Sequence, residues 1–489
     1  MDSITKLRGK LAEAEDILQY VSKELEGYST KDAEEHLNFA ELKLRGEQYS
    51  FYEHPLTDKP FRDDYLALMI YLISLGGKKE EGWTVLYRIA AGCDYQGELQ
   101  NLTTDAMTFT EERLSDLIRE IYSAELANIF AIDSLMISHH MGADDAQLKF
   151  LAGVYELLKL NKGFLTEAIE FVKVPNTIFW DNLVEKIATW KYLSGKDIIT
   201  YIDAYHAVSL EEATKLDYKR IVFYNTTYKD KDVIKLDDWK ANEILFLNCH
   251  FENCGGIHST KQVVKFAECL FDGNVVRYKP LGDGSSRWGW TDEKYFSYRG
   301  FLHFNHVAFG KCTFKNFQDG VPMLYFMNGK IENCIWEHCQ QTLGSMLLNI
   351  NNAVVRDTKF IACQSTLYNF YYHGSYGSPN TSGFGCMIYS YNSLLINNEF
   401  TSCINKVNIN DSGSPLSCIL LMEKSSCKRC NFKNINLSCI YGYHSDKKGA
   451  IATIGMVESE EQDNQGISIT NVSTIPKEIF IVGNKKHED

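Results

Sequence analysis

The chain of 489 residues lacks the features that identify several common classes of protein. No apolar run reaches the roughly 18–20 residues of a membrane-spanning helix, so we do not expect a membrane protein. The N-terminal segment 1–8 opens an amphipathic, charged stretch without the apolar core of a secretory signal. We therefore expect a cytoplasmic protein.

The sequence also lacks the motifs G-x-x-x-x-G-K-S/T, G-x-G-x-x-G and G-x-S-x-G, which mark nucleotide and hydrolase sites. Basic residues do not cluster. Residues 1–240 contain 28 Lys and Arg against 42 Asp and Glu, and residues 241–489 contain 22 of each, which gives the net charge of −14. We expect no nucleic-acid partner, because phosphate backbones find no basic patch. The acidic half is suited to cations or to a basic partner surface.

Cysteine is nearly absent from the first half, since thirteen of the 14 cysteines follow residue 240. Many of them share one frame, in which a small residue is followed by any residue and then by an aromatic ring. This frame occurs at Cys249–Phe251, Cys269–Phe271, Cys312–Phe314, Cys334–Trp336 and Cys430–Phe432, and with a polar first residue at Thr358–Phe360 and Asn398–Phe400. The spacings are 20, 43, 22, 24, 40 and 32 residues, and 43 and 40 are close to two units. A non-helical repeat of this length is typical of a stacked solenoid.

The repeat predicts how these side chains are used. The cysteines are read as reduced, buried small residues rather than as a disulfide framework. The aromatic residues are predicted to stack along the axis. Asn occurs 25 times after residue 240 and 7 times before it, and it suits left-handed corners and ladders. The positions expected in that role are Asn333, Asn352, Asn397–Asn398 and Asn434.

Short apolar runs separated by Asn, Gly and Ser follow residue 240, and no helix-length segment lies between them, which excludes a βαβ sheet. This half resembles the pectate-lyase-like superfamily over residues 241–475. The resemblance implies a right-handed parallel β-helix. Pentapeptide-repeat helices are the alternative, although their five-residue period is not sustained.

Residues before 240 have helical periodicity. An apolar helix from Asp63 ends at Gly76–Gly77 and another starts at Lys79, and a similar pair at 126–137 and 144–160 is separated by His139–Gly142. Residues 60–175 resemble the tellurite-resistance TerB-like helical domain. The resemblance implies acidic turns linked to metal binding and a role in bacterial stress or phage-response systems.

The two turns depart from that family to different degrees. The first turn carries two lysines where the family has a carboxylate. In the second turn, Asp144 and Asp145 are candidate metal ligands, but capping of the following helix is the favoured interpretation of both residues. We expect no cofactor.

The expected fold class is multidomain α and β, with an all-α part followed by a right-handed parallel β-helix solenoid. The predicted organisation is N-terminal helices at 1–60, a TerB-like domain at 61–175, a connecting or capping segment at 176–240, and the β-helix at 241–489.

Two insertions, 277–299 and 368–384, concentrate aromatic residues. Their candidate binding residues are Arg277, Trp288, Trp290, Tyr295, Tyr298, Tyr371, Tyr372 and His373. Such residues form both protein hot spots and sugar-stacking platforms, so composition leaves the ligand open.

A β-helix lyase or hydrolase needs paired carboxylates, or a metal with a basic side chain. The repeat strands carry almost no carboxylates. In the first insertion, Asp283, Arg287 and Asp292 are candidate catalytic residues, but solvated loop charges are the favoured interpretation of all three. Cys427–Cys430 is a lone C-x-x-C whose second cysteine is already a repeat anchor.

The sequence therefore predicts a non-enzymatic cytoplasmic adaptor that binds a protein partner through the β-helix. The TerB resemblance implies a place in a bacterial stress or phage-defence system. The alternatives are a carbohydrate-active β-helix enzyme that uses the 277–299 loop and a glycan-binding module without catalysis. The oligomeric state is not predicted.

Overall fold

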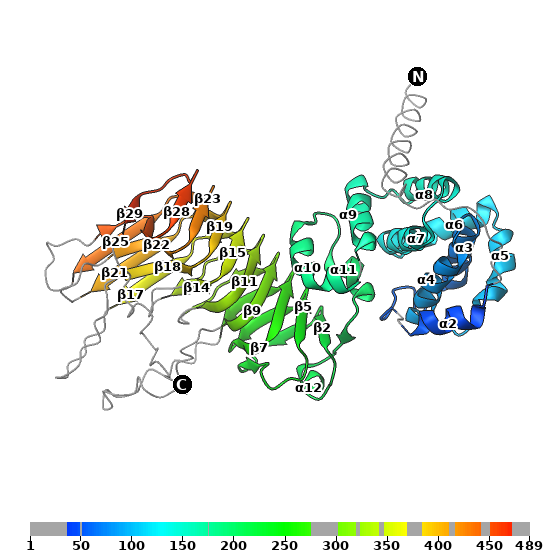
Figure 1. The fold of residues 1–489 in the computed structure, drawn as a ribbon, viewed down its shortest axis with the longest axis horizontal. Coiled ribbons are helices and arrows are strands. Elements are labelled where there is room, and N and C mark those ends of the chain that lie inside the picture. The colour runs from blue at the N-terminus through cyan, green and yellow to red at the C-terminus, as the bar shows by residue number, and fades with distance from the viewer. Residues whose placement is uncertain are drawn as a thin grey trace, which may run out of the picture. The chain divides into compact units, whose positions relative to one another are not determined.

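The computed structural model describes residues 37–48, 51–174, 176–274, 302–318, 323–341, 347–368, 384–409, 416–441 and 450–471. Helices form the first part of the chain and all-parallel sheets the second, as predicted (Figure 1). Two compact units result: Met1–Leu183 with Trp190–Asp203, and Val184–Thr189 with Ala204–Asp489. We call them the helical unit and the parallel-sheet unit. Among the described residues, no helix has the length and apolar character needed to cross a membrane.

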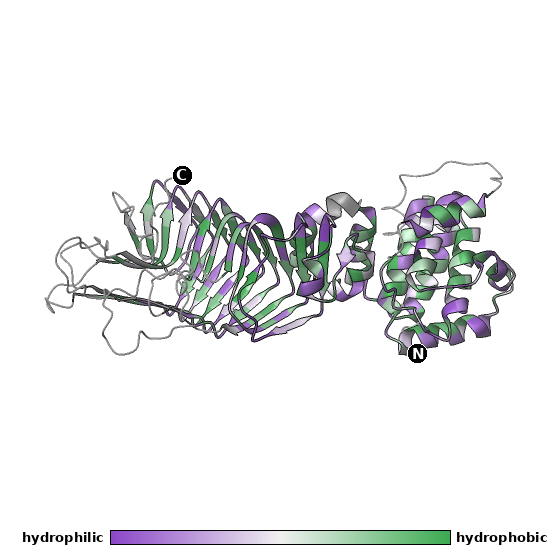
Figure 2. Ribbon diagram, turned by 90° about the horizontal axis from the view of Figure 1, so that it is seen from below, coloured by the Kyte–Doolittle hydropathy of each residue, from purple (hydrophilic) through white to green (hydrophobic). Residues whose placement is uncertain are grey.

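The helical unit is built around two helices that are buried on nearly all sides, α3 and α7. In Figure 2, hydrophobic and hydrophilic residues alternate along the helices of this unit. Its elements are α2 (Phe39–Glu47), α3 (Arg62–Ser74), α4 (Lys79–Gly92), η1 (Leu99–Leu102), α5 (Thr103–Met107), α6 (Glu111–Ser123), α7 (Ala127–Met141), α8 (Asp145–Leu157), α9 (Lys162–Lys173), α11 (Gly195–Ile198) and η2 (Ile199–Tyr201), while α10 (Asn176–Thr189) crosses the unit boundary.

The predicted helix limits are confirmed at most ends. Helix α3 begins within one residue of Asp63, and α4 begins at Lys79. The predicted break at His139–Gly142 contains the observed end of the helix, because α7 continues through both histidines to Met141. It ends at Gly142, whose φ of 77° is a left-handed conformation that glycine adopts at little cost.

The parallel-sheet unit contains three sheets in which every pairing is parallel. The largest holds β1 (Tyr205–His206), β2 (Arg220–Tyr224), β4 (Ile234–Lys235), β5 (Glu243–Leu247), β7 (Ile257–Ala267), β9 (Leu302–Gly310), β11 (Leu324–Glu332), β14 (Leu348–Asn351), β15 (Ala353–Arg356), β18 (Phe384–Tyr391), β19 (Leu394–Ile396), β22 (Leu416–Glu423), β23 (Ser426–Lys428), β26 (Ala450–Ile451), β27 (Ile454–Val457), β28 (Glu460–Gln462) and β29 (Ile469–Asn471).

The second sheet holds β3 (Thr227–Lys229), β6 (His250–Cys254), β8 (Leu270–Asn274), β10 (Thr313–Lys315), β12 (Ile335–Glu337), β16 (Lys359–Ile361), β20 (Glu399–Thr401) and β24 (Asn431–Lys433). The third holds β13 (Gln340–Gln341), β17 (Gln364–Tyr368), β21 (Ile404–Ile409) and β25 (Asn436–Tyr441). One short helix, α12 (Leu210–Ala213), precedes β2. Each strand pairs with the equivalent strand of the next sequence repeat, so repeats lie side by side.

The predicted aromatic stack is confirmed. Register places the seven rings opposite one another in successive strands of the second sheet. Adjacent rings are stacked with centroids 4.0–6.1 Å apart, at Phe251, Phe271, Phe314, Trp336, Phe360, Phe400 and Phe432. Tyr228 extends the column by one repeat. A second column, Phe223–Phe246–Phe266–Phe309, was not predicted. Each such contact adds about 0.5–1.5 kcal/mol beyond its buried area.

A left-handed residue stands before the inward small residue at most corners. Asn333, Asn352, Asn397 and Asn434 have φ near 50°, as predicted. Asn398 was assigned the same role, and that assignment is wrong. It is buried in the position that cysteine takes elsewhere, where its amide donates to the Val355 carbonyl (2.9 Å) and accepts from the Thr358 N–H (3.1 Å).

One local contact explains why cysteine, serine and threonine interchange in the repeat. The inward side chain donates to the carbonyl two residues earlier, across the left-handed residue. Cys269 does so to Ala267 (3.4 Å), Thr358 to Arg356 (3.0 Å) and Ser393 to Tyr391 (2.7 Å). The frame therefore selects a small donor rather than a thiol as such. All 14 cysteines are free and buried, which confirms the prediction of reduced, buried cysteines.

The parallel strands begin earlier than residue 241, the start that the sequence predicts. Strands β2, β3 and β4 already pair in register with β5, β6 and β7. The reason is that Thr226 and Tyr228 carry the small–x–aromatic frame without a cysteine. The last part of α10 also belongs to this unit, because Lys330 forms an ion pair with Glu185 (2.5 Å) and Asn333 donates to the Ala188 carbonyl (2.7 Å).

Candidate functional site

The candidate residues in the two aromatic insertions lie outside the described residues. This applies to the catalytic candidates Asp283, Arg287 and Asp292, and to the binding candidates Arg277, Trp288, Trp290, Tyr295, Tyr298, Tyr371, Tyr372 and His373. The structure places the strands that flank these insertions: β8 and β9 around the first, and β17 and β18 around the second.

Asp144, one of the two candidate metal ligands, is the N-cap of α8. Its Oδ1 accepts from the N–H groups of Ala146 and Gln147 (both 3.0 Å), and Gln147 Oε1 accepts from the Asp144 N–H (3.3 Å). This capping box satisfies the open N–H groups of the first turn. Asp145 is exposed in that turn. Across the described parts of the chain, no group of three His, Cys, Asp or Glu side chains is placed to hold a metal ion.

A buried polar cluster in the helical unit surrounds Asp133. Its carboxylate accepts hydrogen bonds from the Tyr65 hydroxyl (2.6 Å) and the Tyr201 hydroxyl (2.7 Å), and His54 Nε2 lies 3.1 Å away. All four side chains are buried. Burial raises the pKa of Tyr65 and of Tyr201 well above 10, so both remain protonated donors at neutral pH. The cluster joins α3, α7 and η2, and we assign it a structural role.

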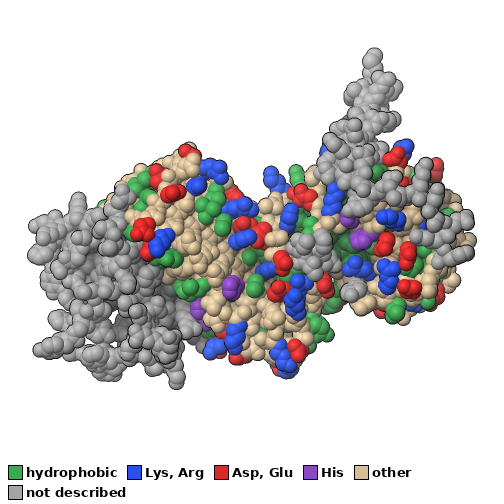
Figure 3. All heavy atoms as spheres, viewed as in Figure 1, with side chains coloured by type: hydrophobic (Ala, Val, Ile, Leu, Met, Phe, Trp, Pro, Cys, Tyr) green, Lys and Arg blue, Asp and Glu red, His purple; other side chains and the backbone are tan. Residues whose placement is uncertain are grey.

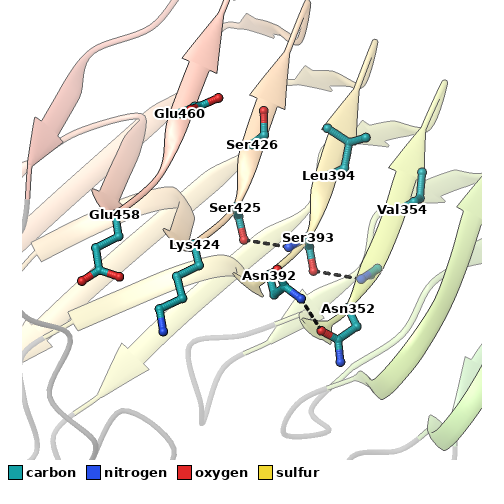
Figure 4. A pocket seen from close by; sticks show the side chains of 11 residues that line it. Asn352, Val354, Asn392, Ser393, Leu394, Lys424, Ser425, Ser426, Glu458 and Glu460 are labelled. Carbon is teal, nitrogen blue, oxygen red and sulfur yellow. Dashed lines mark hydrogen bonds between the residues drawn. The ribbon is translucent and has the colours of Figure 1, made fainter.

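A shallow polar groove lies on the outer face of the parallel-sheet unit (Figure 4). Its volume is about 580 Å³, within the range of ligand sites. It is lined by residues 352–354, 392–394 and 424–426 with Glu458 and Glu460. We call it the amide groove. It crosses four successive repeats at the same corner.

Register fixes the rows of the amide groove. One wall is the row of left-handed residues Asn352, Asn392, Lys424 and Glu458, whose φ angles are 46–49°. The other is the row Val354, Leu394, Ser426 and Glu460, which pair strand by strand. Between the walls, the Oγ atoms of Ser393, Ser425 and Ser459 each accept from the backbone N–H of the preceding repeat (3.1 Å). These serine hydrogen bonds, the serine ladder, fix the backbone between the two walls, which forms the floor of the groove.

An amide ladder runs along the left-handed row. Asn392 donates to Asn352 (2.6 Å), Asn352 donates to Asn328 (3.3 Å), and Asn328 donates to the Asn305 carbonyl (3.3 Å). Every Nδ2 in this ladder points toward the preceding repeat. Asn392 Oδ1 accepts no hydrogen bond from any residue that the structure describes, and the next residue in the row is Lys424.

Charged side chains of both signs line the groove. Ion pairs link successive repeats of the second sheet, at Lys229–Glu252 (2.6 Å), Lys315–Asp272 (3.0 Å) and Lys433–Glu399 (3.0 Å). Charges of both signs are interspersed on the face in Figure 3. By contrast, Lys424, Glu458 and Glu460 make no ion pair with any residue that the structure describes. Lys424 lies 5.6 Å above the Tyr391 ring.

One further polar atom of the groove is without a partner. The buried Ser426 hydroxyl has no hydrogen bond to any described residue.

No family model matches the chain, and no curated protein matches it. The site must therefore be interpreted from its own chemistry: amide, hydroxyl, ammonium and carboxylate groups in a fixed, open array, which is suited to binding.

Sequence reasoning singled out Asn352 as a ladder position and missed the rest of the groove. In this row, Asn392 follows Asn352 by 40 residues, Lys424 follows Asn392 by 32, and Glu458 follows Lys424 by 34. Unequal insertions between them hide the alignment. The detectable signal is a serine after three of the four left-handed residues, at Ser393, Ser425 and Ser459.

Proposed function

We propose that the protein is a non-enzymatic cytoplasmic adaptor and that its parallel-sheet unit is a right-handed parallel β-helix serving as a rigid binding platform for a protein partner. Repeats that pair strand to strand in register, with two aromatic columns inside, support the β-helix. Parallel crossovers in one sheet are right-handed in almost all proteins, which supports the handedness.

The observation that carries the proposal is the locked outer surface at the amide groove. Serine and amide ladders bond each repeat to the next, so the outward side chains keep fixed spacings without a partner. A surface ordered in advance loses little conformational entropy when it binds. The open groove exposes these groups to a macromolecule rather than enclosing a small substrate.

We also propose a role in a bacterial stress or phage-defence system. The support is the resemblance of residues 60–175 to TerB-like domains, together with the order of two helix pairs along the chain, α3–α4 and α7–α8. In this proposal the acidic helical unit provides a second binding surface.

The test is affinity purification of the tagged full chain from its native cells, with quantitative mass spectrometry. One variant carries Trp288→Ala and Trp290→Ala, and a matched control carries Tyr192→Ala, an exposed aromatic residue of the helical unit. We expect a stoichiometric protein partner that is lost only from the tryptophan variant. If no protein co-purifies in stoichiometric amount with the wild-type chain, the adaptor proposal fails. Cleavage of a glycan by the purified chain would contradict its non-enzymatic part.

A further inference from the structure

We propose that His258 and His303 form a two-histidine site for a divalent transition-metal ion on the outer face of the parallel-sheet unit. The protein ligands are two imidazole nitrogens, and water or a group from another molecule completes the coordination of the metal. This inference goes beyond the adaptor proposal and does not rest on it, because it involves neither the amide groove nor the two aromatic insertions.

The two histidines lie side by side on neighbouring strands. His258 of β7 and His303 of β9 are register partners, because these two strands pair in parallel. Their sequence neighbours Ile257, Leu302 and Phe304 are buried in the core of the unit. Side chains alternate between the two faces of a strand, so both imidazoles belong to the outer face.

The separation of the two rings suits a shared metal ion. Their centroids lie 6.0 Å apart, and their planes are inclined by 74°. A metal–nitrogen bond of about 2.1 Å and a ring radius of about 1.1 Å allow two imidazoles on one metal to have centroids up to roughly 6.4 Å apart. A tetrahedral angle at the metal brings the centroids to roughly 5.2 Å. The observed distance lies between these values, so both rings can reach one ion without movement of the strands.

The strands fix the spacing of the pair before a metal binds. Strand β7 pairs with β5 and β9, and β9 pairs with β7 and β11, so neither histidine stands on an edge strand. Ligands on paired strands are positioned more precisely than ligands on loops. His303 is 5% exposed, and the Tyr325 ring packs beside it with a centroid distance of 5.0 Å. His258 is half-buried, which leaves one side of the pair open for further ligands.

The chemistry of the pair selects the class of ion. Imidazole nitrogen suits Zn²⁺, Cu²⁺ and Ni²⁺, whereas Ca²⁺ and Mg²⁺ require oxygen ligands. Lys235 precedes His258 in the same row of the sheet and places a positive charge nearby. Its side chain is exposed and has a flexible stem, so the ammonium group can move away from a bound cation.

The test is a titration of the full chain with Cu²⁺ alone, because Cu²⁺ binds nitrogen ligands most tightly among the first-row divalent metals. The chain carries no histidine tag and is first freed of metal with a chelator. Isothermal titration calorimetry measures the affinity, and electron paramagnetic resonance counts the coordinated nitrogens. We expect one tight equivalent with hyperfine splitting from two nitrogens. His258→Ala and His303→Ala should each weaken its binding by at least about tenfold.

The matched control is His306→Ala. His306 is exposed on the same strand as His303, but its register partners are Val263 and Asn328, so no second histidine lies opposite it. Its loss should leave the affinity for Cu²⁺ unchanged. Circular dichroism melting shows whether each variant is folded. If loss of the buried His303 impairs folding, the half-buried His258 decides the result.

Three results would overturn the inference. The first is no saturable binding of Cu²⁺ by the wild-type chain in the micromolar range, or a spectrum with a single coordinated nitrogen. The second is equal affinity of the wild-type chain and His258→Ala. The third is equal weakening by His306→Ala. None of these results bears on the adaptor proposal, which the capture experiment tests with other residues.

Discussion

The repeat frame shows what can and cannot be predicted from single residues. The small–x–aromatic pattern is local, so it predicted the stacked rings and the buried cysteines. Asn398 was misassigned because Asn serves two positions, the left-handed corner and the inward site. The two are adjacent in sequence, and only the backbone dihedral separates them.

The inward site can be tested by exchanging its donor. Thr358 donates to the Arg356 carbonyl (3.0 Å) and accepts from the Cys334 N–H (3.4 Å). Thr358→Val keeps the shape but removes both bonds. The Cys334 N–H is then unpaired, while the Arg356 carbonyl still accepts from the Asn333 N–H (3.1 Å). We expect a loss of about 1–2 kcal/mol in the free energy of unfolding. Thr358→Cys restores the donor and should cost less than about 1 kcal/mol. Urea unfolding measures both. Equal stability of the Val and Cys variants would contradict the donor role.

A second residue-scale prediction concerns Glu167 in α9. Its carboxylate accepts hydrogen bonds from three consecutive backbone N–H groups, those of Lys191 (2.8 Å), Tyr192 (2.8 Å) and Leu193 (2.7 Å). Glu167→Ala leaves all three donors to solvent. We expect the free energy of unfolding to fall by about 1–3 kcal/mol, and hydrogen exchange of residues 191–193 to accelerate. The exposed Glu156→Ala in α8 serves as the control and should change neither.

At the scale of elements, helices were predicted more accurately than the first strands. Helix starts carry local signals, as the capping box at Asp144 shows. Strand pairing in this chain joins residues 15–45 positions apart, so it can be predicted from the sequence only where a repeat is recognised. Because the first repeat contains no cysteine, the start of the parallel strands was predicted at residue 241, after that repeat.

The contact between β9 and the end of α10 makes an element-scale prediction. A Cβ added at Gly310 would lie 2.7 Å from the Val184 carbonyl oxygen and 3.2 Å from the Ala188 Cβ. Gly310→Ala must therefore push residues 184–189 away from the strand, at a cost of about 1–3 kcal/mol. Faster hydrogen exchange across 184–189 reports the displacement. Gly77→Ala is the matched control, because nothing lies within 4 Å of its added Cβ, and it should be neutral.

At the scale of the whole molecule, the order of helices and parallel sheets was predictable, and the groove was not. The repeat appears in the sequence as a recurring spacing of residues. The groove, in contrast, depends on how the corners of four repeats of unequal length align in space. Most of the two aromatic insertions, 277–299 and 368–384, which were the predicted binding sites, lies outside the described residues. The site assigned from the structure is instead made of Asn, Ser, Lys and Glu, which are unremarkable in composition.

The distribution of buried thiols predicts how the whole molecule responds to alkaline pH. Burial raises the pKa of Cys418 and of Cys93 to about 12, and raises that of Cys403 in the same direction. An unfolded thiol has a pKa near 8.5. The folded-state pKa is the higher one, so this stability is fully present below about pH 8.5 and is lost as pH rises toward 12. Each such thiol lowers the free energy of unfolding by about 1.4 kcal/mol per pH unit in that window.

Most of the thiols whose pKa is raised lie after residue 240, among them Cys254, Cys363, Cys403 and Cys418, so the loss should be concentrated in the parallel-sheet unit. Urea unfolding at pH 7, 8.5 and 10, followed by far-ultraviolet circular dichroism, tests this. We expect equal stability at the first two values, apart from a small change near the unfolded pKa, and a steep fall at the third. Because a disulfide would remove two titrating thiols, a reductant should leave all three curves unchanged. Stability that stays constant up to pH 10 would mean that the thiols are open to solvent in the folded chain.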